Sequence, residues 1–171
     1  MTGSTGGPVS PERMQLVTFR VGVDLFATDI FAVERVLRFS PPRPIPNLPV
    51  WVEGVIEYGG RVVPVIDLRA RFELPAATSR EFSRILIMLV SADEWIAAIV
   101  DSVEEVTTVT AEQLAPPPPL FRGLAGQYLR ALVRPAQDDE PVVVLLDVAR
   151  LLSSRERIVL DQAIAGARAR G

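Results

Sequence analysis

Two apolar segments flank Gly59-Gly60 within residues 54–72, GVIEYGGRVVPVIDLRARF. A Gly-Gly pair suits a two-residue turn that needs positive φ at both central positions. The pattern therefore predicts a β-hairpin, and the turn fixes its register. The expected opposed pairs are Tyr58 with Arg61, Glu57 with Val62, Ile56 with Val63 and Val55 with Pro64.

Pro64 stands in the middle of the returning strand, where a backbone N–H is normally needed. Hydrogen-bonded and non-hydrogen-bonded pairs alternate from the turn, so Val55 and Pro64 form a non-hydrogen-bonded pair. The hairpin thus loses no bond, but the other side of the strand must be an edge, a bulge or a barrel corner. Such a proline either protects an edge from aggregation or leaves that edge free for docking.

The apolar pattern occurs twice along the chain, at an offset of 70 residues that later becomes 80. We infer a duplicated β unit, in which residues 16–36 and 86–106 are equivalent strands of two barrels. The matched blocks are Leu16–Phe19 with Leu86–Leu89, Asp24–Ala27 with Glu94–Ala97, Val33–Val36 with Val103–Val106, and Pro64–Leu68 with Val144–Val148.

Each unit contains short apolar strands followed by a strand that runs into an aspartate and a helical turn. Short strands at this spacing are typical of small barrels or a sandwich. We expect Asp67 and Asp147 to cap the backbone N–H groups of the turns that follow them. The two barrels are expected at about residues 14–80 and 81–150.

The chain ends with a different pattern. Ser153 and Glu156 form a capping box, and the spacing of the apolar residues after it predicts one helical stripe. We expect this helix, over residues 153–171, to pack on the first barrel. Residues 1–13 are expected to be a flexible tail. The predicted stripe consists of Ile158, Val159, Ala163, Ile164 and Ala167.

The amino-acid composition restricts the possible functions of the chain more than its possible folds. The 49% apolar content and the mean hydropathy of +0.27 allow a substantial core, and the net charge of -3 gives no basic footprint for nucleic acid. No apolar run approaches the roughly 18 residues of a membrane helix. The start has neither the basic residues nor the apolar core of a signal peptide, and cysteine is missing, which fits a cytoplasmic protein.

The residue types that are missing exclude most chemistry. The chain has no His and no Cys, and all 18 basic residues are Arg. This composition removes the usual general base, the thiol nucleophile, nearly every transition-metal site and every catalytic lysine. The composition is still compatible with an enzyme that uses two carboxylates. However, the one acidic pair in an apolar run, Glu104-Glu105, has its side chains on opposite faces of a strand. We therefore expect no enzymatic activity, no cofactor and no metal.

The same residues carry a resemblance to the CheW family, the adaptors of bacterial chemotaxis-type signalling. It runs from about Leu16 to Leu152 and implies a CheW-like domain over residues 14–152. This domain would consist of two SH3-like five-stranded β-barrels, in agreement with the repeat, followed by the C-terminal α-helix. The motifs that carry it are Leu16–Phe19, Phe26-Ala27, Gly54–Gly60, Val63–Arg69, Val100–Val103, Thr110–Leu114 and Leu146–Leu152.

The resemblance also implies a function. Such a protein couples the cytoplasmic tips of chemoreceptors to the CheW-like regulatory domain of a CheA-type histidine kinase, so it would be associated with membrane receptor arrays through its partners. By matching position, the receptor-binding groove would contain Val33, Gly54, Ile85 and Val106. Read from the residues alone, the three aliphatic positions fit ordinary core equally well, and Gly54 fits a tight turn or a close backbone approach.

Two positions depart from the family pattern. The family usually has Glu where this chain has Arg35, and Arg where it has Gly59; both positions help to form the kinase contact in the family. A like charge opposite Arg35 can cost several kcal/mol at an interface. The chain is then either a paralogue that serves a dedicated pathway and its own kinase, or it has drifted at solvated positions. The alternative function is a β-barrel peptide-binding module in unrelated signalling.

Overall fold

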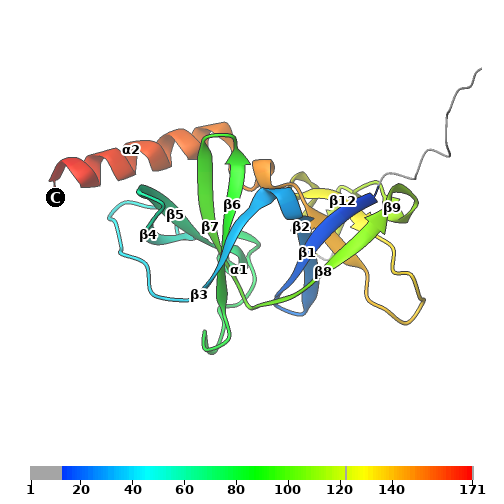
Figure 1. The fold of residues 1–171 in the computed structure, drawn as a ribbon. Helices are drawn as coiled ribbons and strands as arrows, with labels where there is room; N and C mark the ends of the chain where they lie inside the picture. Colours follow the sequence, from blue (N-terminus) through cyan, green and yellow to red (C-terminus); the bar gives the residue numbers. More distant parts are fainter. Residues whose placement is uncertain (1–12, 122, 171) are drawn as a thin grey trace, which may run out of the picture.

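The computed structural model describes residues 13–121 and 123–170, which form two β-sheets and a C-terminal helix (Figure 1). The predicted tail lies outside these residues except for Arg13, the first residue of β1. The six-stranded sheet contains, in spatial order, β8 (Ser102–Thr110), β1 (Arg13–Val21), β2 (Asp24–Asp29), β13 (Val143–Leu146), β12 (Leu129–Val133) and β9 (Leu114–Ala115).

The five-stranded sheet contains β3 (Val33–Arg38), β6 (Arg84–Ser91), β7 (Glu94–Val100), β5 (Arg61–Asp67) and β4 (Val52–Tyr58), again in spatial order. A small ribbon pairs β10 (Leu120–Phe121) with β11 (Leu124–Ala125). The helices are α1 (Leu68–Arg71) and α2 (Ser154–Arg170), with single 3₁₀ turns η1 (Ile30–Ala32), η2 (Ala111–Gln113), η3 (Gly126–Tyr128) and η4 (Val148–Arg150). The mainly β fold with a C-terminal helix is as predicted, although one barrel has a sixth, two-residue strand.

The internal repeat is present in the topology. The hairpin β1–β2 is followed by β3, and the equivalent hairpin β6–β7 is followed by β8. Each hairpin also receives one parallel neighbour, β13 beside β2 and β5 beside β7. Residues 16–36 and 86–106 therefore occupy equivalent places in the two sheets.

The predicted division of the barrels at residue 80 is wrong, because the halves exchange strands. β3 leaves the hairpin that precedes it and pairs with β6, whereas β8 leaves its own hairpin and pairs with β1. Both hairpins present similar apolar edges, so the local pattern does not determine which of them an edge strand joins. Each sheet consequently contains strands from both halves of the sequence.

Strand alternation produces three apolar cores. One face of the five-stranded sheet surrounds Val63, Ile87 and Ile99, and the equivalent face of the six-stranded sheet surrounds Leu16, Ala131 and Leu145. The opposite faces meet in a larger inter-barrel core. Its members include Phe19, Phe26, Ile66, Leu68, Leu86, Met88, Val100, Tyr128 and Leu146.

The predicted hairpin is confirmed in detail. Tyr58 opposes Arg61 and Val55 opposes Pro64, and Gly59 and Gly60 have φ of 57° and 76°. The second neighbour of β5 is β7, whose pairing begins only at Val65. The first half of β5 thus has no second strand partner within the described residues, which is the open edge that the proline predicts.

Three predictions concern caps and the last helix. Asp67 accepts a hydrogen bond from the Arg69 N–H at 3.0 Å, as expected, whereas the Asp147 side chain caps no N–H and instead lies 3.4 Å from Arg150. The capping box is present: the Ser153 N–H donates to Glu156 at 2.8 Å, and the Glu156 N–H donates to the Ser153 hydroxyl at 3.1 Å.

The predicted apolar stripe of α2 is right only in its second half, where Ala163, Ile164 and Ala167 are partly buried. Ile158 is 57% exposed, whereas Leu160 is 2% exposed and lies in the inter-barrel core. The rotation of the helix is set by Leu160 and by the ion pair between Arg157 and Glu94. α2 runs along the five-stranded sheet and contacts both halves of the repeat there, not the first half alone (Figure 1).

Candidate functional site

Four valines lie on the side of β3 and β8 that faces the inter-barrel core. Directly opposed residues in a ladder project to the same face. On β3, Val33 opposes Met88 and Val36 opposes Leu86, and both of these partners belong to the inter-barrel core. β3 is an edge strand of its sheet, so this face continues to the surface.

The equivalent face of β8 carries Val103 and Val106. Val103 opposes Phe19 of the inter-barrel core, and Val106 opposes Val17, which is on the same face of β1 as Phe19. Val106 is 54% exposed and Val36 is also exposed. We call these four residues, Val33, Val36, Val103 and Val106, the valine strip. In Figure 1 its two strands lie on the near side of the molecule, where the sheets meet.

The structure does not bring all four predicted groove residues together. Val33 and Val106 belong to the valine strip, but Ile85 is 2% exposed inside the five-stranded barrel, opposite Leu37 and Ile99. Its side chain therefore supports β3 from within and cannot touch a partner directly. For Ile85 the structure supports the core interpretation.

Gly54 is buried and allows a close approach between two backbone segments. Its φ is 149°, and a Cβ there would lie 2.2 Å from the carbonyl oxygen of Arg43. The adjacent Val55 exchanges two hydrogen bonds of 2.9 Å with Arg43, which joins the segment after β3 to β4. Gly54 thus closes the barrel instead of lining a groove.

A second surface lies at the turn between β4 and β5. The rings of Tyr58 and Trp95 pack with centroids 5.4 Å apart, and the Arg61 guanidinium lies 4.6 Å from the Trp95 ring. Arg61 also donates a hydrogen bond of 3.1 Å to the Asp93 carbonyl. The turn between β4 and β5 therefore packs against the turn between β6 and β7. The two turns lie at the same end of the sheet because β5 and β7 run parallel.

This packing accounts for the glycine at position 59. A Cβ on Gly59 would lie 3.1 Å from the Trp95 ring, in a backbone conformation that disfavours side chains. Gly59 lacks the cation that the resemblance leads us to expect at this position, but Arg61 places another cation at the same turn. Arg61 and Trp95 each lie beside a hairpin turn, because Arg61 is the first residue of β5 and Trp95 is the second residue of β7.

Arg35 lies near the same end of the five-stranded sheet. It opposes Ile87, and Ile87 opposes Ala97, which is two residues from Trp95 along β7. Arg35 is exposed and has no ion pair with any described residue. It opposes a residue of the barrel interior, whereas Val36 opposes one of the inter-barrel core, so the two side chains project from opposite faces of β3. The kinase and receptor positions implied by the resemblance are therefore on different faces.

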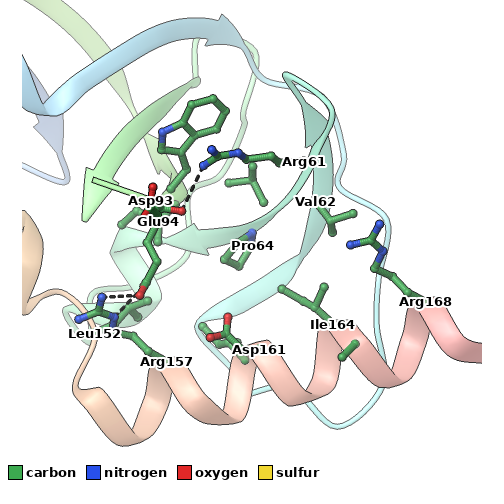
Figure 2. A pocket seen from close by; sticks show the side chains of 15 residues that line it. Arg61, Val62, Pro64, Asp93, Glu94, Leu152, Arg157, Asp161, Ile164 and Arg168 are labelled. Carbon is green, nitrogen blue, oxygen red and sulfur yellow. Dashed lines mark hydrogen bonds and ion pairs between the residues drawn. The ribbon is translucent and has the colours of Figure 1, made fainter. Parts of the chain in front are cut away.

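A cavity of about 240 Å³ separates α2 from the open half of β5. Figure 2 shows Pro64 and Ile164 facing each other across it, with the Arg157–Glu94 pair at one end. The helix thus covers the edge that the sequence leaves free beside Pro64. The chain's own helix, and not a partner strand, occupies this position.

Several acidic residues of the described chain pair with arginines. Glu104 pairs with Arg20 at 3.0 Å, and Arg80 bridges Glu53 and Asp67. Burial raises the pKa of Asp67, although Arg80 and the capped Arg69 N–H oppose the effect. Among residues 13–121 and 123–170, no group of three acidic, His or Cys side chains could hold a metal ion.

Comparison with known proteins identifies the family. Residues 15–156 match the CheW-like domain. The chain belongs to the CheW-like family. It is 32% identical to "Chemotaxis protein CheW" of Treponema pallidum over 86% of this chain and 87% of that protein, and 31% identical to the protein of the same name from Klebsiella aerogenes over 86% of each.

Two further comparisons extend the similarity. The CheW-like chain is 30% identical to "Protein FrzA" of Myxococcus xanthus, over 87% of this chain and 91% of that protein. The crystal structure of "scaffolding protein TtCheW" from Thermoanaerobacter tengcongensis matches with a TM-score of 0.75 and 25% identity, over 90% of this chain and 96% of that one. No helix formed by the described residues is long and apolar enough to span a membrane.

Proposed function

We propose that this protein is an adaptor that couples chemoreceptors to a CheA-type histidine kinase and performs no chemistry itself. The observation that carries the proposal is the CheW-like match across residues 15–156 together with the two-barrel fold of a scaffolding protein. Members of the family are adaptors and scaffolds. The protein would work in the cytoplasm and reach receptor arrays in the membrane through its partners.

The receptor would bind at the valine strip. Its side chains are apolar, lie on edge strands of both sheets and include the exposed Val36 and Val106. Exposed aliphatic residues at a junction between two rigid barrels suit the apolar face of a helical receptor tip. Ile85 and Gly54 would act indirectly, by holding β3 and β4 in place.

The kinase would bind at the opposite face of β3 and the adjoining turn, through Arg35 and the surface formed by Tyr58, Gly59, Arg61 and Trp95. Arginine and aromatic side chains are enriched in the parts of interfaces that dominate affinity. Because Arg35 replaces an acidic family residue, its partner would present an acidic or neutral group. The similarity to a separately named family member, FrzA, supports a paralogue that serves a dedicated pathway.

The test is reconstitution with purified receptor fragment and kinase, both taken from the operon or genome neighbourhood of this protein. The adaptor function requires that the protein bind each partner and that the kinase associate with the receptor through it. Binding to an unrelated peptide with neither partner bound would instead support a β-barrel peptide-binding module.

A further inference from the structure

Two arginines face each other directly across the strand pair β3–β6. Arg38 opposes Arg84, and Arg84 in turn opposes Val100 of the inter-barrel core. Directly opposed residues share a face, and like charges in such a pair are destabilising. The pair therefore lies on the same face as Val33 and Val36 and opposes folding there.

Neither arginine has an acidic partner among the residues that the structure describes. Arg38 is exposed and takes part in no ion pair, and Arg84 donates only to the carbonyl oxygens of Phe82 and Ser83, at 3.1 and 2.9 Å. The positive charge of both side chains is thus available to a partner.

Exposed apolar side chains flank the pair. Val36 is exposed two residues before Arg38, and Phe82, two residues before Arg84, is 71% exposed. Arginine and aromatic residues together are the composition typical of interface hot spots. The repeat offers an internal comparison, because Thr108, at the position on β8 equivalent to Arg38, opposes the neutral Gln15. The charged pair is therefore a feature of one end of the valine strip only.

We propose that Arg38 and Arg84, with Val36 and Phe82, dock an acidic segment of the receptor tip and so fix the direction in which that tip lies along the valine strip. The inference rests on the proposed function, since it names the chemistry of the receptor partner. Charge complementarity selects the occupant: two unpaired cations beside exposed apolar side chains fit an apolar helix that carries carboxylates at one end.

The experiment compares Arg38→Glu, Arg84→Glu and the double variant, with Arg134→Glu as the control. Arg134 is exposed directly after β12 of the other sheet and has no ion pair with a described residue. Titration calorimetry with the purified cytoplasmic fragment of the neighbouring chemoreceptor measures affinity, and thermal unfolding measures stability. The same variants are titrated with the kinase.

Affinity for the receptor fragment should fall roughly tenfold for each reversal, and the loss should shrink at high salt. Stability should follow a different order. Each single variant creates a cross-strand ion pair and should melt higher than the wild type, whereas the double variant restores a like-charged pair and should melt near it. A purely structural pair would not separate affinity from stability in this way.

Unchanged receptor affinity in the double variant would overturn the inference, as would an equal loss with Arg134→Glu or a loss confined to the kinase. If the wild type binds the receptor fragment and only the arginine reversals have no effect, the proposed function stands without this inference. If the wild type does not bind the fragment at all, both fail.

Discussion

Arg71 and Glu156 form a two-pronged ion pair, with Nη1 to Oε2 at 2.9 Å and Nη2 to Oε1 at 2.6 Å. The Arg71 guanidinium also lies 4.1 Å from the Trp51 ring and 5.2 Å from the Tyr128 ring. Trp51 precedes β4 of one sheet and Tyr128 precedes β12 of the other. One side chain therefore joins both barrels to the first turn of α2.

Replacing Glu156 by Gln should destabilise the protein by about 1–2 kcal/mol, because Arg71 is nearly buried and would lose its counterion while Glu156 is partly exposed. Burial raises the pKa of Glu156, but the hydrogen bonds from Arg71 and Ser153 outweigh it and hold the pKa below its ordinary value. The stabilisation is therefore complete above the pKa of the unfolded chain and is lost as the pH falls through the folded pKa.

Urea unfolding of wild type and Glu156→Gln at neutral and acidic pH measures this effect. The difference in the free energy of unfolding between the two proteins should shrink on acidification. The pH dependence that comes from the raised pKa of Asp67 is present in both proteins and cancels in this difference. Glu94→Gln, in the more exposed pair with Arg157, is the control and should cost less. A difference that stays constant with pH would contradict the role of the Glu156 charge.

Gly54→Ala should be among the most damaging single substitutions, with a loss of about 2 kcal/mol or more, because the new Cβ would collide with the Arg43 carbonyl. Gly60→Ala is the matched control. It also has positive φ, but no atom lies within 4 Å of its Cβ position, so the expected cost is only the roughly 1–2 kcal/mol of the left-handed conformation. Equal losses in thermal unfolding would show that the close approach at Gly54 is unimportant.

The features that follow from local chemistry could be predicted from the sequence. The Gly59-Gly60 turn determines the register of its hairpin, and Ser153 with Glu156 determines the start of α2, because each depends on neighbouring residues. The repeat similarly predicts two equivalent β units.

The remaining features depend on contacts between distant segments. β3 and β8 could each pair with either of two similar hairpins. The local sequence pattern does not distinguish these pairings, so it could not show that the predicted boundary at residue 80 is wrong. Ile85 lies on β6, a strand with apolar residues buried on both of its faces. Only the pairing of β6 with its neighbours shows which of the two cores the Ile85 side chain enters. The contact of Arg61 with Trp95 likewise requires the parallel pairing of β5 with β7.

Arg35→Glu should leave stability within about 0.5 kcal/mol of the wild type, because the side chain is exposed and unpaired. It should weaken binding to the cognate kinase and strengthen binding to a kinase of the ordinary family type, whose contact is suited to Glu. Titration calorimetry against both kinase domains at two salt concentrations measures these affinities. The difference in affinity between the two variants should decrease as the salt concentration rises, because salt screens exposed charges. Equal affinities of both variants for both kinases would identify Arg35 as a drifted, solvated residue.

Val106→Glu should abolish receptor binding and leave the fold intact, because the side chain is already half exposed on the valine strip. Ile85→Glu is the contrasting variant. It would place an unpaired charge inside the five-stranded barrel and should unfold the protein. Thermal unfolding beside a receptor-binding assay distinguishes the two, and a collapse of the Val106→Glu melting temperature would contradict its place on the surface.

Kinase recruitment tests the adaptor function most directly. Membranes or vesicles that carry the receptor's cytoplasmic fragment are mixed with the kinase and sedimented, with and without this protein. The adaptor account predicts that the kinase sediments only when the protein is present, and that Val106→Glu releases both proteins while Arg35→Glu releases the cognate kinase alone. Sedimentation of the kinase to the same extent without the protein, or failure of the protein to sediment with the receptor-bearing vesicles, would contradict it.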